Sequence, residues 1–202
     1  MPKGDHKNWD HPNKKQSTRV EPIKDKEKIN AIKGLLSDQP RDFLLWTLGL
    51  QTGIRATDIL NLKVEDVRYL GNGDWLQIKE GKKKKLNQIF INPEVYKAIV
   101  RYNEAYPDSP DHSPLIFNLR EPEKGLSIVH VANLVRKWCQ TVNCKGRFGA
   151  RTMRKSFVFH QIKSGENIAS LRKRMGHSSE KMTREYADVS DEDVQRLCMR
   201  VL

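Results

Sequence analysis

The chain has 202 residues, enough for one domain with its own core, and 37% of them are hydrophobic. Lysine and arginine number 37 against 25 acidic residues, a formal net charge of +12, which makes nucleic acid the leading class of partner. No apolar run approaches the ~20 residues that a membrane span needs, and the first 28 residues contain no apolar run typical of a secretory signal. We therefore expect neither a membrane protein nor an exported one.

The cysteine and histidine pattern indicates no metal chemistry. The three cysteines are an odd number without zinc-type spacing, so we expect free thiols in a reducing cytoplasm. They are Cys139, Cys144 and Cys198. The histidines form no ligand pair at a metal-binding spacing. We expect no metal, no other cofactor and no small-molecule ligand.

Residues 1–22 are polar and rich in Lys, Asn, Asp and Pro, which is typical of a mobile arm. Two interpretations stay open. The arm is either a solvated tail, or a basic segment whose cations lie along a DNA backbone. Those cations are Lys3, Lys7, Lys14, Lys15 and Arg19.

Helical patterns follow the arm. A first helix is predicted over Asp25–Ser37, because its apolar residues recur with the helical period. Asp38 and Pro40 signal a second start, and the apolar block Phe43–Leu48 is typical of a buried helix. A third, short helix is predicted to begin near Thr57.

The period then changes to the alternation that is typical of strands, at Trp75–Ile78 and Gln88–Ile91. The lysine run Lys82–Lys85 lies between them and predicts a β-hairpin with a basic tip. An earlier short strand around Val67 is expected to complete a three-stranded sheet. Asn92–Glu94 supplies an N-cap, a proline at the first helical position and an acid, which predicts the next helix.

Further helices are predicted in the C-terminal half. One is capped by Ser127, and others cover about 151–163 and 167–175, with Gly176 as the stop. A last helix over about 190–202 has one apolar face. The expected fold is therefore mainly α, with a small three-stranded antiparallel sheet against one side.

Three arginines are candidates for binding a phosphate. Arg55 follows Gly53 and precedes a helix start, where unpaired N–H groups favour anions and a guanidinium can grip a phosphate in a bidentate fork. Arg151 and Arg154 are three apart, so they share one helical face and repel unless an anion or acid lies between them. Taken singly, each is more often an ordinary surface arginine.

A histidine and a tyrosine complete the set of candidates. His177 follows Gly176 at a helix stop and can donate a hydrogen bond to a phosphate oxygen, although a lone loop histidine is more often structural. Tyr186 lies nine residues further on and is usually a packing residue in such a polar stretch. Because a free phenol has a pKa of ~10, its use as a nucleophile needs nearby cations and a base.

Each signal is weak alone, but their order resembles the catalytic domain of the tyrosine recombinase (phage integrase) family. Thr52–Asp58 looks like the first box of the family, with Arg55 as its arginine. Trp75–Ile91 looks like its second and third strands, and Arg151–Arg154 looks like its second box. Leu171–Tyr186 matches the family's stretch from Leu-Gly-His to the nucleophilic tyrosine.

The resemblance implies DNA strand cleavage and rejoining. Tyr186 would attack the scissile phosphate to give a 3′-phosphotyrosine, while Arg55 and Arg154 neutralise charge and His177 acts as a further donor. The residue at the position of the family's catalytic lysine, a general acid for the leaving 5′-oxygen, is Lys82, and the neighbouring lysines make that choice uncertain. Further DNA contacts are expected from Lys83, Lys84, Lys85 and Lys155.

The resemblance also implies double-stranded DNA as partner, self-association on DNA as a dimer to tetramer, and a cytoplasmic, nucleoid-associated protein encoded by a bacterium or phage. We expect a catalytic domain over 23–202 behind the basic arm 1–22, without a separate core-binding domain. The helix over about 190–202 is expected either to be exchanged between protomers or to pack on its own domain.

One residue departs from the family pattern. Arg151 stands where the family most often has histidine, and arginine cannot act as a general base near neutrality, although it can still bind a phosphate oxygen. An alternative function is therefore a catalytically inactive DNA-binding regulator on the same scaffold. A generic basic protein, such as a ribosomal factor, would leave the spacing of the arginines, His177 and Tyr186 unexplained.

Overall fold

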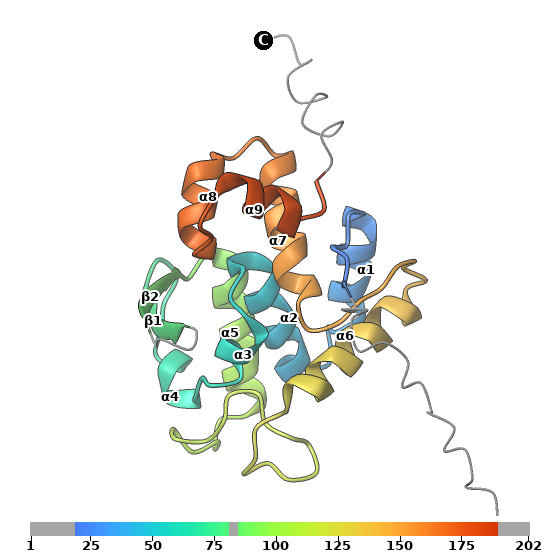
Figure 1. The fold of residues 1–202 in the computed structure, drawn as a ribbon. Helices are drawn as coiled ribbons and strands as arrows, with labels where there is room; N and C mark the ends of the chain where they lie inside the picture. The colour runs from blue at the N-terminus through green and yellow to red at the C-terminus, as the bar shows by residue number, and fades with distance from the viewer. Residues whose placement is uncertain (1–18, 81–84, 190–202) are drawn as a thin grey trace, which may run out of the picture.

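The computed structural model describes residues 19–80 and 85–189, and helices dominate it as predicted (Figure 1). Side chains of residues 79, 80 and 85 lie outside this description. The elements in chain order are α1 (Lys26–Leu35), α2 (Pro40–Thr52), α3 (Ala56–Ile59), α4 (Val64–Val67), β1 (Trp75–Glu80), β2 (Lys85–Phe90), α5 (Pro93–Ala105), α6 (Ile128–Thr141), α7 (Thr152–Lys163), α8 (Ile168–Met175) and α9 (Glu180–Tyr186).

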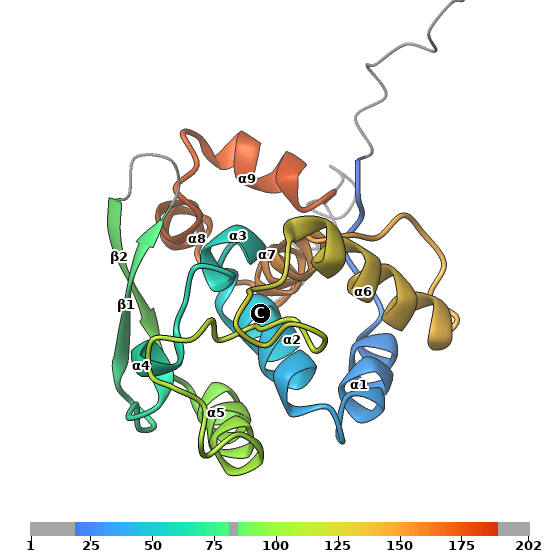
Figure 2. The ribbon, with the colours of Figure 1, turned by 90° about the horizontal axis from the view of Figure 1, so that it is seen from below.

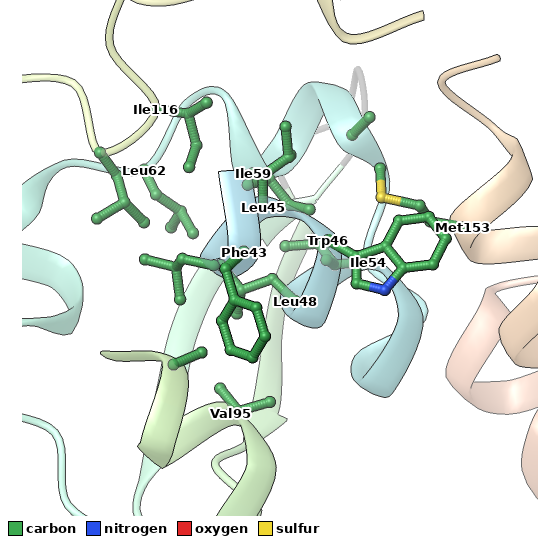
Figure 3. Packing of buried hydrophobic residues seen from close by; sticks show 14 of the residues in the cluster. Phe43, Leu45, Trp46, Leu48, Ile54, Ile59, Leu62, Val95, Ile116 and Met153 are labelled. Atoms are coloured by element: carbon green, nitrogen blue, oxygen red, sulfur yellow. The ribbon is translucent and has the colours of Figure 1, made fainter. Parts of the chain in front are cut away.

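Helix α2 forms the centre of the main core. It begins with Pro40 at a position that needs no N–H donor, and most of its length is buried, because apolar residues surround it on all sides. Figure 3 shows its residues Trp46 and Leu48 packed among neighbours that include Val95 of α5 and Met153 of α7. The helix ends at Gly53 in the left-handed conformation, which turns the chain toward α3.

The sheet is a single antiparallel hairpin in the described residues, with Trp75 paired to Phe90. One face carries Leu76, Ile78 and Ile89 into the core, whereas Trp75 and Phe90 contact each other on the exposed face. The hairpin was predicted correctly. Its tip, Lys82–Lys84, lies outside the described residues.

The predicted third strand around Val67 is wrong, because this segment forms α4. Val64 and Val67 are both fully buried, and their separation of three residues puts them on one helical face. The carboxylate of Asp66 accepts a hydrogen bond from the backbone N–H of Lys63 at 2.8 Å, which stabilises the first turn. A local turn therefore outweighs the β propensity of the two valines.

The other predicted starts and stops are confirmed. Side-chain oxygens of Asp25, Asn92 and Ser127 accept hydrogen bonds from the first turns of α1, α5 and α6, and Gly176 ends α8 in the left-handed conformation. Helix α9, which is capped by Ser179, was not predicted. The helix expected over about 190–202 lies outside the described residues.

Helices α7, α8 and α9 lie together at one end of the molecule (Figure 1). A second apolar cluster joins Val158 and Ile162 of α7 to Leu171 and Met175 of α8 and to Ala187 after α9. Because the first turn of α7 also packs into the main core, α7 connects the two clusters. Figure 2 shows α3 between the hairpin and α7. Helix α9 lies above α3 and α7 in this view.

The end of the predicted arm lies against this body. The backbone N–H of Glu21 donates to the carbonyl of Arg147 at 2.7 Å, and the N–H of Ile23 donates to the hydroxyl of Ser156 at 2.8 Å. Ile23 itself is buried. Residues 1–18 lie outside the described part of the chain. Among the described helices, none has the length and apolar character required to cross a membrane.

Candidate active site

A cleft of about 1430 Å³ opens beside α7, and the segments before α3, after α8 and at the end of α9 contribute to its wall. It collects residues that lie more than a hundred positions apart in the sequence. The predicted site residues with a described position all line it, together with Arg19, Arg136 and Arg147. Those predicted residues are Arg55, Arg151, Arg154, Lys155, His177 and Tyr186.

Arg154 connects the two halves of the cleft wall. Its guanidinium donates from Nη1 to the carbonyl of Gly53 at 2.5 Å and from Nη2 to the carbonyl of Met175 at 2.8 Å. Gly53 precedes the Arg55 segment, and Met175 precedes the His177 segment. Arg154, a residue that is only 4% exposed, therefore fixes both segments and still contributes to the cleft wall.

Arg55 occupies the N-cap position of α3 and is more exposed than Arg154. Its Nη1 lies 3.5 Å from Oδ2 of Asp58, which is buried one turn further on. Asp58 thus aligns the guanidinium without removing it from the cleft. Because α3 has only four residues, we attribute the affinity for an anion at this position to the arginine rather than to the helix.

Arg151 immediately precedes α7, and its side chain is exposed at the cleft. The hydroxyl of the neighbouring Thr152 accepts from the backbone N–H of Gly149 at 3.1 Å, which fixes the turn into the helix. Both arginines line the same cleft, but they differ in burial. Arg154 is a buried bridge, and Arg151 is a cation at the rim.

His177 and Tyr186 contact each other in the cleft, with ring centroids 5.1 Å apart and ring planes 59° apart. Nδ1 of His177 lies 3.1 Å from the hydroxyl oxygen of Thr183 on α9. Burial is the main cause that lowers the pKa of His177 below its usual value, and the positive charges of Arg154 and Arg55 lower it further. The ring is therefore neutral near pH 7.

Tyr186 ends α9 and packs half-buried against the second apolar cluster. Burial raises the pKa of its phenol, and the charges of Arg154, Arg151 and Arg55 oppose that rise, as does a hydrogen bond from Arg154. Burial outweighs the cations in the free protein. The phenol thus keeps its proton at neutral pH and has to lose it when the oxygen acts as a nucleophile.

Lys155 lies deeper than a surface DNA contact would. It is 6% exposed, its ammonium donates to Oδ2 of Asp188 at 3.0 Å, and it lies 5.6 Å from the centroid of the Tyr186 ring. Arg19 binds the other oxygen of Asp188. Arg19 was expected among the cations of the arm, but its pairing with Asp188 could not be predicted, because this contact joins segments 169 positions apart.

The expected lysines of the hairpin tip, Lys82, Lys83 and Lys84, lie outside the described residues, as does the side chain of Lys85. Within the described residues, no group of three or more His, Cys, Asp or Glu side chains is arranged to hold a metal ion. The described part of the cleft instead combines several arginines with a neutral histidine and a phenol, a set suited to binding a phosphate ester and attacking it.

The sequence comparisons agree with this chemistry. The model of the phage integrase family matches residues 21–193. The probable integrase/recombinase YoeC of Bacillus subtilis (strain 168) is 31% identical over 90% of this chain and 96% of YoeC. The tyrosine recombinase XerC of Caldanaerobacter subterraneus subsp. tengcongensis is 27% identical over 84% of this chain and 47% of XerC. The chain belongs to the phage integrase family, and its enzyme class is that of the site-specific tyrosine recombinases.

The fold agrees as well. The crystal structure of the XerH site-specific recombinase bound to its palindromic difH substrate, in a post-cleavage complex, matches with a TM-score of 0.69. The match has 20% sequence identity and covers 90% of this chain and 52% of XerH. The chain thus spans about half the length of XerC and XerH but nearly all of YoeC.

Proposed function

We propose that this chain cleaves and rejoins DNA strands, with Tyr186 as the nucleophile. The phenolic oxygen attacks the scissile phosphate, which gives a 3′-phosphotyrosine and a free 5′-hydroxyl. The phosphotyrosine conserves the energy of the broken bond, so rejoining needs no further energy source. The observation that carries the proposal is the convergence of Arg55, Arg154 and His177 on Tyr186 in one cleft.

The arginines have separate roles in this proposal. Arg55 and Arg154 neutralise the charge that develops on the phosphate, a kind of oriented charge that can supply several kcal/mol. Arg151 is placed to bind a phosphate oxygen, but it cannot accept a proton. The general acid for the leaving 5′-oxygen is Lys82 in the hairpin tip, with the neighbouring lysines as further DNA contacts.

Double-stranded DNA is the proposed partner. The structurally similar XerH is bound to its DNA substrate, and further arginines, Arg136 and Arg147, line the cleft beyond the catalytic set. We also propose that residues 23–202 act as one catalytic domain and that two to four copies assemble on DNA. The segment 190–202 is the proposed contact between copies.

Removing the hydroxyl of Tyr186 tests whether this residue is the nucleophile. Tyr186→Phe should abolish the covalent adduct on a nicked DNA substrate and leave DNA binding nearly intact, because the change removes the nucleophile but no cation. Adduct formation is measured on a denaturing gel. Tyr96→Phe on α5 is the matched control, since Tyr96 does not line the cleft. It should form the adduct at the wild-type rate.

The same assay separates the alternative function. A DNA-binding regulator on this scaffold would bind DNA but form no adduct in the wild-type protein. A wild-type protein that binds the duplex without becoming covalently attached would replace the recombinase proposal with the regulator. An adduct that persists in Tyr186→Phe would place the nucleophile elsewhere.

A further inference from the structure

The hydrogen bonds of Thr183 indicate where neutral His177 carries its proton. Thr183 is fully buried, and its hydroxyl donates to the backbone carbonyl of Ser179 at 3.2 Å. A carbonyl oxygen can only accept, so in this bond the hydroxyl of Thr183 is the donor. With the hydroxyl proton in that bond, the hydroxyl oxygen is the acceptor in the 3.1 Å contact with Nδ1 of His177, and we assign the ring proton to Nδ1 on this basis.

The other ring nitrogen is left as a proton acceptor. A neutral imidazole has one N–H, so Nε2 of His177 has a lone pair when Nδ1 is protonated. Such a ring cannot donate from Nε2 to a phosphate oxygen, as the sequence expectation required. It can do so only after it has gained a second proton. The assigned tautomer is suited to take a proton first.

Tyr186 has a proton to lose beside this acceptor. Its oxygen accepts a hydrogen bond from Arg154, which has no proton-accepting capacity of its own. Among the described residues that line the cleft, His177 and Glu185 are the histidine and carboxylate side chains. Glu185 is the exposed neighbour of Tyr186 on α9, and adjacent helical positions do not face each other.

We propose that His177 accepts the phenolic proton of Tyr186 at Nε2, directly or through one water, and that Thr183 is the positioning residue that keeps Nε2 free of a proton. The inference rests on the proposed cleavage reaction. The tyrosine oxygen forms the new bond to phosphorus, and the bond from phosphorus to the 5′-oxygen breaks with its electron pair on that oxygen. The phenolic proton moves to His177, and the general acid of the hairpin protonates the 5′-oxygen. Rejoining reverses each transfer.

The charges around His177 favour this role. Arg154 faces it from α7, Arg55 from the segment before α3, and Tyr186 from α9, while Glu185 lines the same cleft. The two arginines and burial keep the ring neutral in the free protein. A negatively charged phosphate between the arginines would then favour the imidazolium that forms as the proton is transferred.

The first test reads the tautomer in the free protein, without DNA or activity. Nitrogen NMR of the labelled protein distinguishes Nδ1–H from Nε2–H, and the His177 signals are assigned by their loss in His177→Gln. We expect Nδ1–H in the wild type and in Thr183→Ser, which keeps the hydroxyl. Thr183→Val removes the acceptor oxygen and should shift the population toward Nε2–H. An Nε2–H tautomer in the wild type would overturn the proposal.

The second test uses the sign of the pH dependence. On a substrate whose 5′-bridging oxygen is replaced by sulfur, the leaving group needs no protonation, so one titration remains visible. If neutral His177 is the acceptor, the cleavage rate rises with pH through its pKa and then levels off. If the imidazolium acts as a donor, the rate falls above that pKa and the proposal is wrong.

The variants separate positioning from folding. Thr183→Val should lower cleavage on the sulfur substrate about tenfold, a part of the 10²–10⁴-fold that a general base contributes, and Thr183→Ser should restore most of the rate. Should the valine variant not fold, the wild-type tautomer and pH profile decide alone. A wild type without any DNA adduct would refute the proposed function, whereas a wrong tautomer or pH sign in an active enzyme would refute only this inference.

Discussion

Arg154 holds two segments of the site in position in addition to its proposed role in binding the phosphate. Its planar guanidinium donates to the carbonyls of Gly53 and Met175 at once, so the distance between the Arg55 and His177 segments depends on the shape of the group and not on its charge alone. Lysine carries the same charge but has no fork that can reach two carbonyls.

Arg154→Lys should therefore lower the rate of adduct formation at least ~100-fold, the scale of losing one oriented charge-stabilising donor. The rate is measured on a nicked substrate at saturating protein. Arg136→Lys, at an exposed position on α6 in the same cleft, is the matched control. It should change the rate by no more than about threefold, because either cation can meet a phosphate oxygen on an exposed surface. Equal rates for Arg154→Lys and wild type would show that charge alone matters.

Asp188 links stability to pH. Burial by itself raises the pKa of this carboxyl, but hydrogen bonds from Lys155 and Arg19, and their charges, outweigh burial, so the pKa falls below its usual value of 3.8. A carboxyl whose pKa is lower in the folded state contributes stability that is fully present above its unfolded pKa. That contribution is lost as the pH falls through the folded pKa.

Asp188→Asn should thus lower the free energy of unfolding at pH 7 by about 1–3 kcal/mol, the range for hydrogen bonds to charged groups. The difference from wild type should begin to shrink below about pH 4, where the unfolded carboxyl binds protons, and should be lost as the pH falls through the lower folded pKa. Denaturant unfolding at several pH values measures both. Asp111→Asn, which breaks a more exposed pair with Arg68, should cost less than about 1 kcal/mol. Equal costs for the two variants would show that the Lys155 contact is not special.

At the scale of elements, the turn from α2 into α3 positions Arg55. Gly53 adopts a φ of 63°, and a Cβ at this position would lie 2.4 Å from Cδ1 of Phe157 on α7. Both the backbone conformation and the close approach of α7 therefore require glycine. The carbonyl of the same residue accepts the hydrogen bond from Arg154.

Gly53→Ala should lower the free energy of unfolding by about 1–3 kcal/mol, the cost of a strained backbone position, and displace Arg55. We expect cleavage to fall further than this loss of stability explains, even at a temperature where the variant is folded. Gly34→Ala on α1 has no atom within 4 Å of its added Cβ and is the control, with stability unchanged or slightly increased. A folded Gly53→Ala with normal cleavage would separate this turn from the site.

The helices that could be predicted were those with strong local signals. Caps at Asp25, Asn92 and Ser127 and the stop at Gly176 depend on residues within one turn, and the structure has all of them. Helix α9 escaped prediction because it buries small groups, Thr183 and Ala187, which give a weak apolar pattern. The segment around Val67 was read as a strand because its β-branched residues are consistent with both periods.

The site residues also divide into features that could be predicted from the sequence and features that could not. A resemblance supplied its candidate residues, and the described ones do line one cleft. It could not supply the role of Thr183 or of Asp188, because those roles depend on hydrogen-bond directions and on contacts between distant segments. Nor could spacing reveal that Arg154 and Lys155 are buried whereas Arg151 is exposed.

At the scale of the whole molecule, cations greatly outnumber acids in the lining of the cleft. Cations from three regions of the chain line the cleft in addition to Arg55 and Arg154. They are Arg19, Arg136, Arg147, Arg151 and Lys155. Glu185 is the one acidic residue among the described residues that line it. Because the chain has a net charge of +12, its affinity for duplex DNA should depend strongly on the salt concentration.

Each phosphate that the protein neutralises adds about −0.9 to the slope of log K against log salt. The double variant Arg136→Ala, Arg147→Ala should make the slope shallower by up to about 1.8 units, if each arginine neutralises one phosphate. Fluorescence anisotropy of a labelled duplex at several salt concentrations gives the slopes. Lys97→Ala on α5, outside the cleft, should leave the slope unchanged. A slope near zero for the wild type would exclude duplex DNA as the partner.

The ion pair between Arg19 and Asp188 brings the two ends of the described chain into contact. The two ends of the described chain, Arg19 and Val189, both line a small hollow together with Asp188. A module attached through either end would therefore be tethered beside this hollow. For a DNA-clamping partner, the order in which the two modules are encoded would matter little, because the tether starts from the same point in both arrangements.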